Sequence, residues 1–148
     1  MTARTMQSAA ELCHSKGLAF TQLRRQVYEL IAAEPRPVGA YELLDKLKTT
    51  RGNAAPVTVY RTLDFLLDAG LIHRIDALQA YTACEAEQPD HSGLLLVCNH
   101  CKAVTELEDP RLEQQIARAT RHQAFHLADG LIEIRGLCAA CAHSEPHS

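Results

Sequence analysis

The sequence contains little of what characterises membrane, fibrous or disordered proteins. It has no tryptophan, only 5% aromatic residues, and seven glycines and six prolines in 148 residues. Glycine and proline are too scarce for a collagen-like or low-complexity chain. Uninterrupted apolar runs such as Leu94–Cys98 extend over a few residues and are too short to span a bilayer. The length and the 47% hydrophobic fraction therefore indicate a globular chain of one or two small domains.

A signal peptide and an excess of positive charge are also missing. Met1–Ser8 has no apolar core of the kind that a signal peptide requires, so we expect a cytoplasmic protein without a membrane partner. The net charge of −3 argues, taken alone, against a nucleic-acid-binding protein. Six cysteines in a cytoplasmic chain favour metal or redox chemistry over structural disulfides.

The charge is unevenly distributed along the chain. Residues 1–79 carry 10 Lys/Arg and 8 Asp/Glu, a net charge of +2, whereas residues 80–148 carry 5 and 10, a net charge of −5. The second part also holds six of the eight histidines and five of the six cysteines. An acidic segment rich in Cys and His suits a divalent metal better than phosphate. We place the domain boundary after Ala83, which divides the chain into residues 1–83 and 84–148.

The first part has the element order of a winged helix-turn-helix. Helix-capping and helix-breaking residues, with Thr21 as one N-cap, predict four short helices, at residues 9–16, 22–33, 40–48 and 56–70. A hairpin of two strands is expected after them, at residues 71–75 and 80–83. The fourth helix would bury a stripe of Val57, Leu63, Leu66 and Leu67, leaving polar residues near its N-terminal end. Such an end can enter a DNA major groove, which makes Thr58, Tyr60 and Arg61 candidate DNA-binding residues. Arg24, Arg25 and Tyr41 are candidates for contacts to the DNA backbone.

Residues 84–148 predict a helix packed on a small antiparallel sheet. The strands are expected at 93–97, 103–107 and 130–134, and the helix at 110–123, with Leu112, Ile116 and Ala119 buried. The fold class is therefore α+β: a winged helix-turn-helix followed by a small α/β domain. So small a unit has little core and needs a metal or a partner subunit.

Two Cys-x-x-Cys pairs indicate a structural zinc site. Cys98 with Cys101, and Cys138 with Cys141, each follow a predicted strand, and 36 residues separate the pairs. Four thiolates form a closed tetrahedral site, which is structural rather than catalytic. In the alternative interpretation one pair is a redox dithiol, for which the second pair would be unnecessary. Because no nucleophile–base pair stands out, we do not expect an enzyme or a small-molecule substrate.

A second set of potential ligands lies near the boundary between the two parts. It consists of His73, Cys84, His91 and Glu106. A mixed N/S/O set suits Zn²⁺, although none of the four has a closely spaced partner that would identify a site. A metal bound at this place could couple binding to the relative orientation of the two parts.

The run Pro56–Leu63, the segment Gly70–His73 and the two Cys-x-x-Cys pairs resemble the ferric uptake regulator family, and within it the zinc uptake regulators. The resemblance implies a homodimeric, zinc-responsive repressor that binds AT-rich inverted-repeat operators of zinc-uptake genes. It assigns the structural zinc to the four paired cysteines and a regulatory zinc to the second set, two ions per subunit. It matches Tyr60 and Arg61 to the recognition helix and Tyr41 to a backbone contact.

Two alternative functions and one additional metal site are compatible with these observations. An iron- or manganese-responsive member of the family is one, but a thiolate at Cys84 favours a softer ion such as Zn²⁺. A cytoplasmic zinc-storage or redox protein without a DNA function is another. A third, weak metal site would use the residues Asp90, Glu113, His122 and His126.

Overall fold

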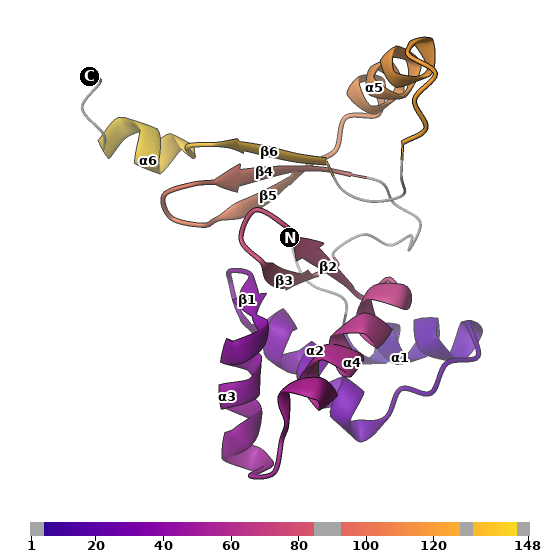
Figure 1. The fold of residues 1–148 in the computed structure, drawn as a ribbon, viewed down its shortest axis with the longest axis vertical. Coiled ribbons are helices and arrows are strands. Elements are labelled where there is room, and N and C mark those ends of the chain that lie inside the picture. The colour runs from indigo at the N-terminus through magenta and orange to yellow at the C-terminus, as the bar shows by residue number, and fades with distance from the viewer. Residues whose placement is uncertain (1–4, 85–92, 128–131, 145–148) are drawn as a thin grey trace. The chain divides into compact units, whose positions relative to one another are not determined.

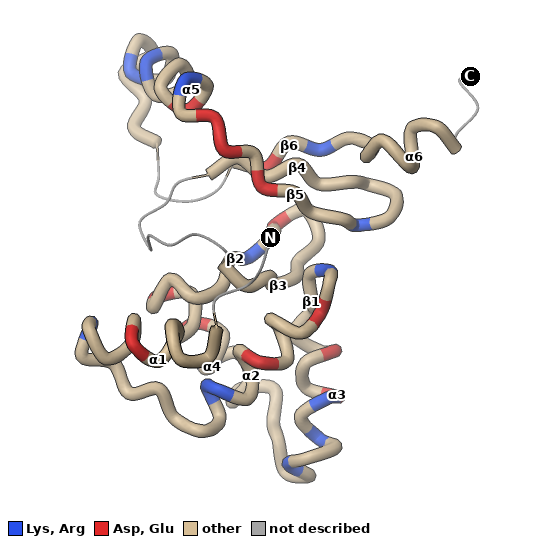
Figure 2. Tube along the Cα trace, turned by 180° about the vertical axis from the view of Figure 1, so that it is seen from behind, with Lys and Arg blue, Asp and Glu red and all other residues tan. Residues whose placement is uncertain are grey.

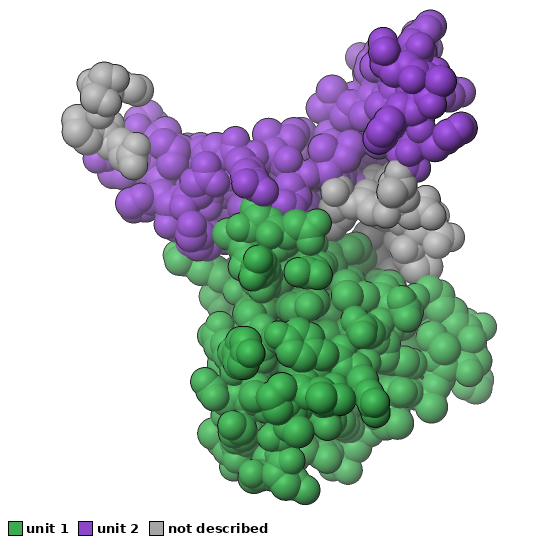
Figure 3. Space-filling model, viewed as in Figure 1, with its two compact units in different colours: residues 1–90 green, residues 91–148 purple. Residues whose placement is uncertain are grey.

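The computed structural model describes residues 5–84, 93–127 and 132–144. The chain forms two compact units, Met1–Asp90 and His91–Ser148, which are coloured separately in Figure 3. We call them unit 1 and unit 2 and describe each by itself. None of the helices within the described residues combines the length and the apolarity that crossing a membrane requires.

Residues 5–84 of unit 1 include four helices whose ends follow from local sequence (Figure 1). These are α1 (Met6–Ser15), α2 (Gln22–Ala33), α3 (Ala40–Thr50) and α4 (Pro56–Asp68). The Thr21 hydroxyl accepts a hydrogen bond from the Arg24 backbone N–H, which confirms the predicted N-cap of α2. Pro56 occupies the first position of α4, and Gly70 follows the helix with a φ of 76°, a conformation that glycine adopts without strain.

A three-stranded antiparallel sheet completes unit 1. Its strands are β1 (Val38–Gly39), β2 (Ile72–Ile75) and β3 (Ala80–Ala83), in the order β1-β3-β2. The hairpin of β2 and β3 was predicted, but β1 was not, because two residues are too few for a periodic pattern. Helices followed by a wing-like hairpin confirm the winged helix-turn-helix arrangement.

The core of unit 1 corrects the predicted stripe of α4. Leu63 and Leu66 are fully buried as predicted, but Val57 is 59% exposed. Val59 and Thr62 are buried instead. Positions 59, 62, 63 and 66 lie on one side of a helix with 3.6 residues per turn, which places Val57 on the opposite side.

Unit 2 is a mixed sheet with two helices. Its elements are β4 (Leu94–Cys98), β5 (Val104–Leu107), α5 (Pro110–His122), β6 (Ile132–Gly136) and α6 (Ala139–Ser144). The strand order is β5-β4-β6: β5 is antiparallel to β4, but β6 is parallel to it. The expected all-antiparallel sheet is therefore wrong, because the chain crosses over through α5 before it returns as β6.

Helix α5 is well capped but contributes nothing to the core of unit 2. The Asp109 carboxylate accepts hydrogen bonds from the backbone N–H groups of Arg111 and Leu112, both at 3.1 Å. Acidic residues precede the helix and Arg121 lies in its last turn, which complements the helix dipole (Figure 2). None of its residues is buried, so the expected burial of Leu112, Ile116 and Ala119 is wrong within this chain. The apolar side of α5 remains exposed.

We expect Leu63→Ala and Val57→Ala to differ in their effect on the stability of unit 1. Removing the fully buried Leu63 side chain should lower the free energy of unfolding by about 2–5 kcal/mol. Val57→Ala should change it by no more than about 0.5 kcal/mol, because the side chain is largely in solvent. Urea unfolding followed by far-UV circular dichroism measures both. Equal losses for the two variants would contradict this assignment of the core.

Candidate functional site

The sheet of unit 2 brings the two Cys-x-x-Cys pairs together. Cys98 ends β4 and Cys101 lies in the turn that follows, whereas Cys138 follows β6 and Cys141 lies in α6. Because β4 and β6 are parallel and Cys98 pairs with Gly136, both strands end at the same edge of the sheet. The parallel pairing thus joins two Cys-x-x-Cys pairs that 36 residues separate in the sequence.

The four cysteines have the geometry of a metal site. Their sulfur atoms all lie within 4.8 Å of one another, and those of Cys101 and Cys138 are 3.8 Å apart. A tetrahedron of thiolates with Zn–S bonds of about 2.3 Å has edges of about 3.8 Å. Cys98 and Cys141 are buried and the other two are half-buried. Among the described residues no other group of His, Cys, Asp and Glu forms such a cluster.

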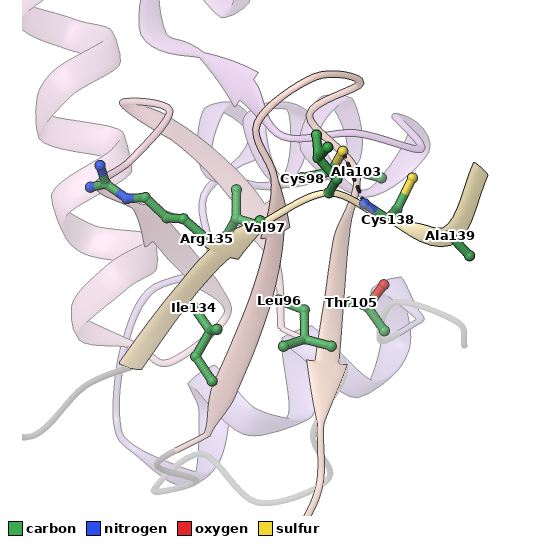
Figure 4. Close-up of a pocket in the computed structure, with 11 residues that line it drawn as sticks. Leu96, Val97, Cys98, Ala103, Thr105, Ile134, Arg135, Cys138 and Ala139 are labelled. Carbon is green, nitrogen blue, oxygen red and sulfur yellow. Dashed lines mark hydrogen bonds between the residues drawn. The ribbon is translucent and has the colours of Figure 1, made fainter. Parts of the chain in front are cut away.

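The surrounding backbone prepares Cys98 to act as a thiolate. The Cys138 N–H donates to the Cys98 sulfur at 3.4 Å (Figure 4). This bond, helped by the Cys101 N–H, lowers the pKa of Cys98 from 9.0 to about 5. Hydrogen bonding with the Cys138 side chain, reinforced by desolvation, raises the pKa of Cys141 from 9.0 to about 12. The four neighbouring thiols therefore differ in how readily they lose a proton. A divalent cation bound at this place would replace the protons and stabilise all four thiolates.

Two residues of the second predicted ligand set share one face of the unit 1 sheet. Ile72 pairs with Ala83 across β2 and β3, and the Cys84 N–H extends this pairing by donating to the Leu71 carbonyl at 2.9 Å. His73 and Cys84 are therefore diagonal neighbours on the same face, about 7 Å apart, within reach of a long side chain. Cys84 is buried and His73 is half-buried.

The other two members of the set belong to unit 2. Glu106 lies on β5 of unit 2, where it pairs with Leu95, and Leu95 pairs in turn with Glu133 of β6. His91 lies outside the described residues. The four-residue regulatory site is therefore still a prediction.

The residues predicted to bind DNA lie on the surface of unit 1. Thr58, Tyr60 and Arg61 are exposed in the first two turns of α4. Tyr41, in the first turn of α3, is 71% exposed. A tyrosine with so little packing can stack or donate a hydrogen bond to a ligand, so all four residues are still candidates for nucleic-acid binding.

Polar contacts between distant segments of unit 1 were not revealed by the sequence. The Gln26 side chain of α2 donates to the Thr50 hydroxyl at the end of α3 at 2.7 Å and accepts from Arg51 Nε at 2.8 Å. At the far end of α4, the Lys16 ammonium donates to the Ala69 carbonyl at 3.0 Å. These partners are at least 24 positions apart in the sequence, and no local pattern identifies such pairs.

Arg24 and Arg25 have internal partners. The Arg24 guanidinium lies 3.7 Å from the centre of the Phe65 ring of α4, and that of Arg25 lies 5.0 Å from the Phe20 ring. Both also donate hydrogen bonds to backbone carbonyls. The contact of Arg24 with Phe65 is a cation–π interaction that stabilises the packing of α2 against α4. The predicted contacts of these two arginines with the DNA backbone are untested.

The weak third metal site finds no support from helix geometry. Glu113 lies in the first turn of α5 and His122 in the last. Nine residues of helix span about 13.5 Å, so the two side chains cannot bind the same ion. His126 is exposed beyond the helix, and Asp90 lies outside the described residues.

Comparison with known proteins gives consistent matches over most of the chain. The model of the ferric uptake regulator family matches residues 15–135. The zinc uptake regulation protein of Escherichia coli is 33% identical over 145 residues, which cover 97% of this chain and 85% of that protein. A zinc uptake regulator in complex with zinc and DNA has a TM-score of 0.85 at 33% identity, covering 93% of each chain. Holo XcZur has a TM-score of 0.80 at 37% identity, covering 94% of this chain and 97% of that one.

We expect Cys138→Ser to release one zinc ion per chain and to unfold unit 2, since serine is a poor ligand for Zn²⁺ and the unit buries few other side chains. Zinc content measured by atomic emission, together with hydrogen exchange of β4 and β6, reports on both effects. Cys13→Ser is the matched control, because Cys13 lies in α1 of unit 1. A variant with full zinc content and protected unit 2 strands would contradict the structural role.

Proposed function

The chain belongs to the ferric uptake regulator family, and on that premise we propose that it is a zinc-responsive repressor of zinc-uptake genes. Membership makes it a metal-responsive transcription regulator and not an enzyme. The proposed details are the metal, the operator, the direction of regulation and the residues. They also include the division of labour, with residues 1–83 binding DNA and residues 84–148 binding metal and dimerising.

The observation that carries the choice of zinc is the placement of Cys84 beside His73 on the sheet of unit 1. A buried thiolate with an imidazole forms a soft, nitrogen–sulfur ligand pair, which favours Zn²⁺ over Fe²⁺ or Mn²⁺. His91 and Glu106 would add one nitrogen and one oxygen ligand and so complete a tetrahedral set. With the four paired cysteines, this gives two zinc ions per subunit.

Zinc responsiveness would follow from where these ligands lie in the chain. His73 and Cys84 belong to unit 1, and His91 and Glu106 to unit 2. Ligands that bind one ion from both units restrict the orientation of one unit relative to the other. If the restricted state binds DNA more tightly, zinc shifts the population towards it, and DNA tightens zinc binding by the same factor.

DNA recognition would use the exposed N-terminal end of α4. Arg61 can donate two hydrogen bonds to a guanine edge, Tyr60 and Thr58 can contact bases or phosphates, and Tyr41 can contact the backbone. In a symmetric dimer two such helices would read an AT-rich inverted repeat whose half-sites lie about 34 Å apart, or a multiple of that distance.

A homodimer would cover the apolar surface that unit 2 leaves exposed. Leu96, Thr105 and Ile134 come from three neighbouring strands and point to the same side of the sheet (Figure 4). They line a pocket of about 350 Å³ together with Leu137. Leu96, Ile134 and Leu137 are all exposed, as is the apolar side of α5. Exposed apolar side chains on one side of a sheet are typical of a subunit interface.

We expect DNA binding to require Zn²⁺ and Cys84. Fluorescence anisotropy of an AT-rich palindromic duplex, with free Zn²⁺, Fe²⁺ or Mn²⁺ buffered separately, should show tight binding with Zn²⁺ only. Cys84→Ala should weaken this binding by about tenfold or more, in line with the coupling between regulatory sites in other proteins.

Cys13→Ala is the matched control, because Cys13 is also a buried thiol of unit 1 but lies in α1. It should retain the zinc response. Binding driven by Fe²⁺ or Mn²⁺ would contradict the choice of metal, and a zinc response that survives Cys84→Ala would contradict the site. Failure to bind any duplex from a random-sequence library would contradict the DNA-binding function.

We expect Ile134→Asp to raise the dissociation constant of the dimer at least about tenfold, because a carboxylate would be buried in an apolar interface. Sedimentation velocity over a range of concentrations measures the change. Arg135→Asp is the matched control, since its side chain points to the other side of the sheet (Figure 4). Equal behaviour of the two variants would place the dimer interface elsewhere.

A further inference from the structure

The outward side of α4 carries one apolar residue that the core does not use. With 100° between successive residues, positions 57, 61, 64 and 68 lie opposite the buried positions 59, 62, 63 and 66. Val57 is near the centre of this outward side and is 59% exposed. It lies one turn before Arg61, so the two side chains are neighbours on the same side of the helix.

The charges along the outward side restrict which part of it can approach DNA. Arg61 lies near the N-terminal end, where the positive pole of the helix dipole also lies. Asp64 and Asp68 occupy the same side in the following turns, and both are exposed. Carboxylates repel the phosphates of a duplex, whereas the N-terminal end attracts them. A duplex is thus expected to meet the first two turns, where Val57 lies.

The chemistry of Val57 selects what it can recognise there. Its isopropyl group has no hydrogen-bond donor or acceptor, so it can neither bind a phosphate nor read the polar edge of a base. The apolar group in the major groove is the C5-methyl group of thymine, which proteins read by van der Waals contact. Side chains at positions i and i+4 are about 6 Å apart, a distance that spans one or two base pairs.

We propose that Val57 is a specificity-determining residue that reads the C5-methyl group of a thymine, one or two base pairs from the base that Arg61 contacts. This inference rests on the proposed DNA-binding function and adds a base-specific contact to it. Val57 was expected to be a core residue, and its exposure on α4 is what redirects its role.

Single thymine-to-uracil substitutions test the contact, because uracil lacks only the methyl group. The probe is a duplex selected by the zinc-loaded wild-type protein from a random-sequence library. Each thymine is replaced in turn, and binding is measured by anisotropy for the wild type and for Val57→Ala. A lost methyl contact should weaken binding by about fourfold.

At one thymine of each half-site, uracil should weaken wild-type binding about fourfold but leave Val57→Ala unaffected. Val57→Thr, which keeps one methyl group, should retain part of the discrimination. Asp68→Ala, at the far end of the same side of α4, should lose as much affinity on uracil substitution as the wild type does. Because Val57 is exposed, circular dichroism should show the alanine variant to be folded.

If uracil weakens the wild type and Val57→Ala equally at every thymine, the inference is wrong, and a residue such as Tyr60 reads the methyl groups. That result leaves the DNA-binding function intact. If the wild-type protein selects no duplex at all, the proposed function fails instead, so the two failures are distinguishable.

Discussion

The parallel pairing of β4 with β6 is the constraint on which unit 2 depends. It places the ends of both strands at one edge of the sheet, and the two Cys-x-x-Cys pairs follow directly. Few side chains of this unit are buried, among them Leu94, Leu95 and Val97. So small a core does not offset the entropy of ordering a sheet, and metal–thiolate bonds can supply the missing free energy. The cluster of four cysteines is therefore part of the fold.

Unit 1 differs from unit 2 because it has a large apolar core of its own, while one side of its helix α4 stays exposed to solvent. Leu63 and Leu66 fix one side of α4, and the Lys16 ammonium donates a hydrogen bond to the Ala69 carbonyl at its C-terminal end. The opposite side carries no packing role. Its side chains can differ without loss of stability, so a DNA-binding role of this side, as proposed, would not compete with folding.

The two predicted metal sites would have different roles: the paired cysteines would stabilise the fold of unit 2, and the second set would respond to the concentration of zinc. The paired cysteines come from one unit and follow the ends of two paired strands, so a metal bound there would hold this unit together. The second set divides its ligands between the units, with His73 and Cys84 already adjacent on one sheet. In the proposed function, such a site would bind metal more weakly than the cysteine cluster, because its remaining ligands must be brought to it. Occupancy can then follow the concentration of free metal.

Local sequence determined the element boundaries with good accuracy, because caps and breakers act over a few residues. Thr21, Pro56, Gly70 and Asp109 mark helix ends that the structure confirms. The spacing of the cysteines was equally informative, since two pairs near strand ends leave few alternatives to a shared metal. Residue types also restricted the metal, because a thiolate ligand is soft wherever the fold places it.

Only the tertiary structure decided how these elements pair and which of their side chains are buried. It made β6 parallel to β4, exposed Val57 while burying Val59, and left α5 without a buried residue. Each of these depends on which segments far apart in the chain pack against one another. A short apolar pattern fits several such arrangements equally well. The choice between them is made by packing, which no single segment of sequence contains.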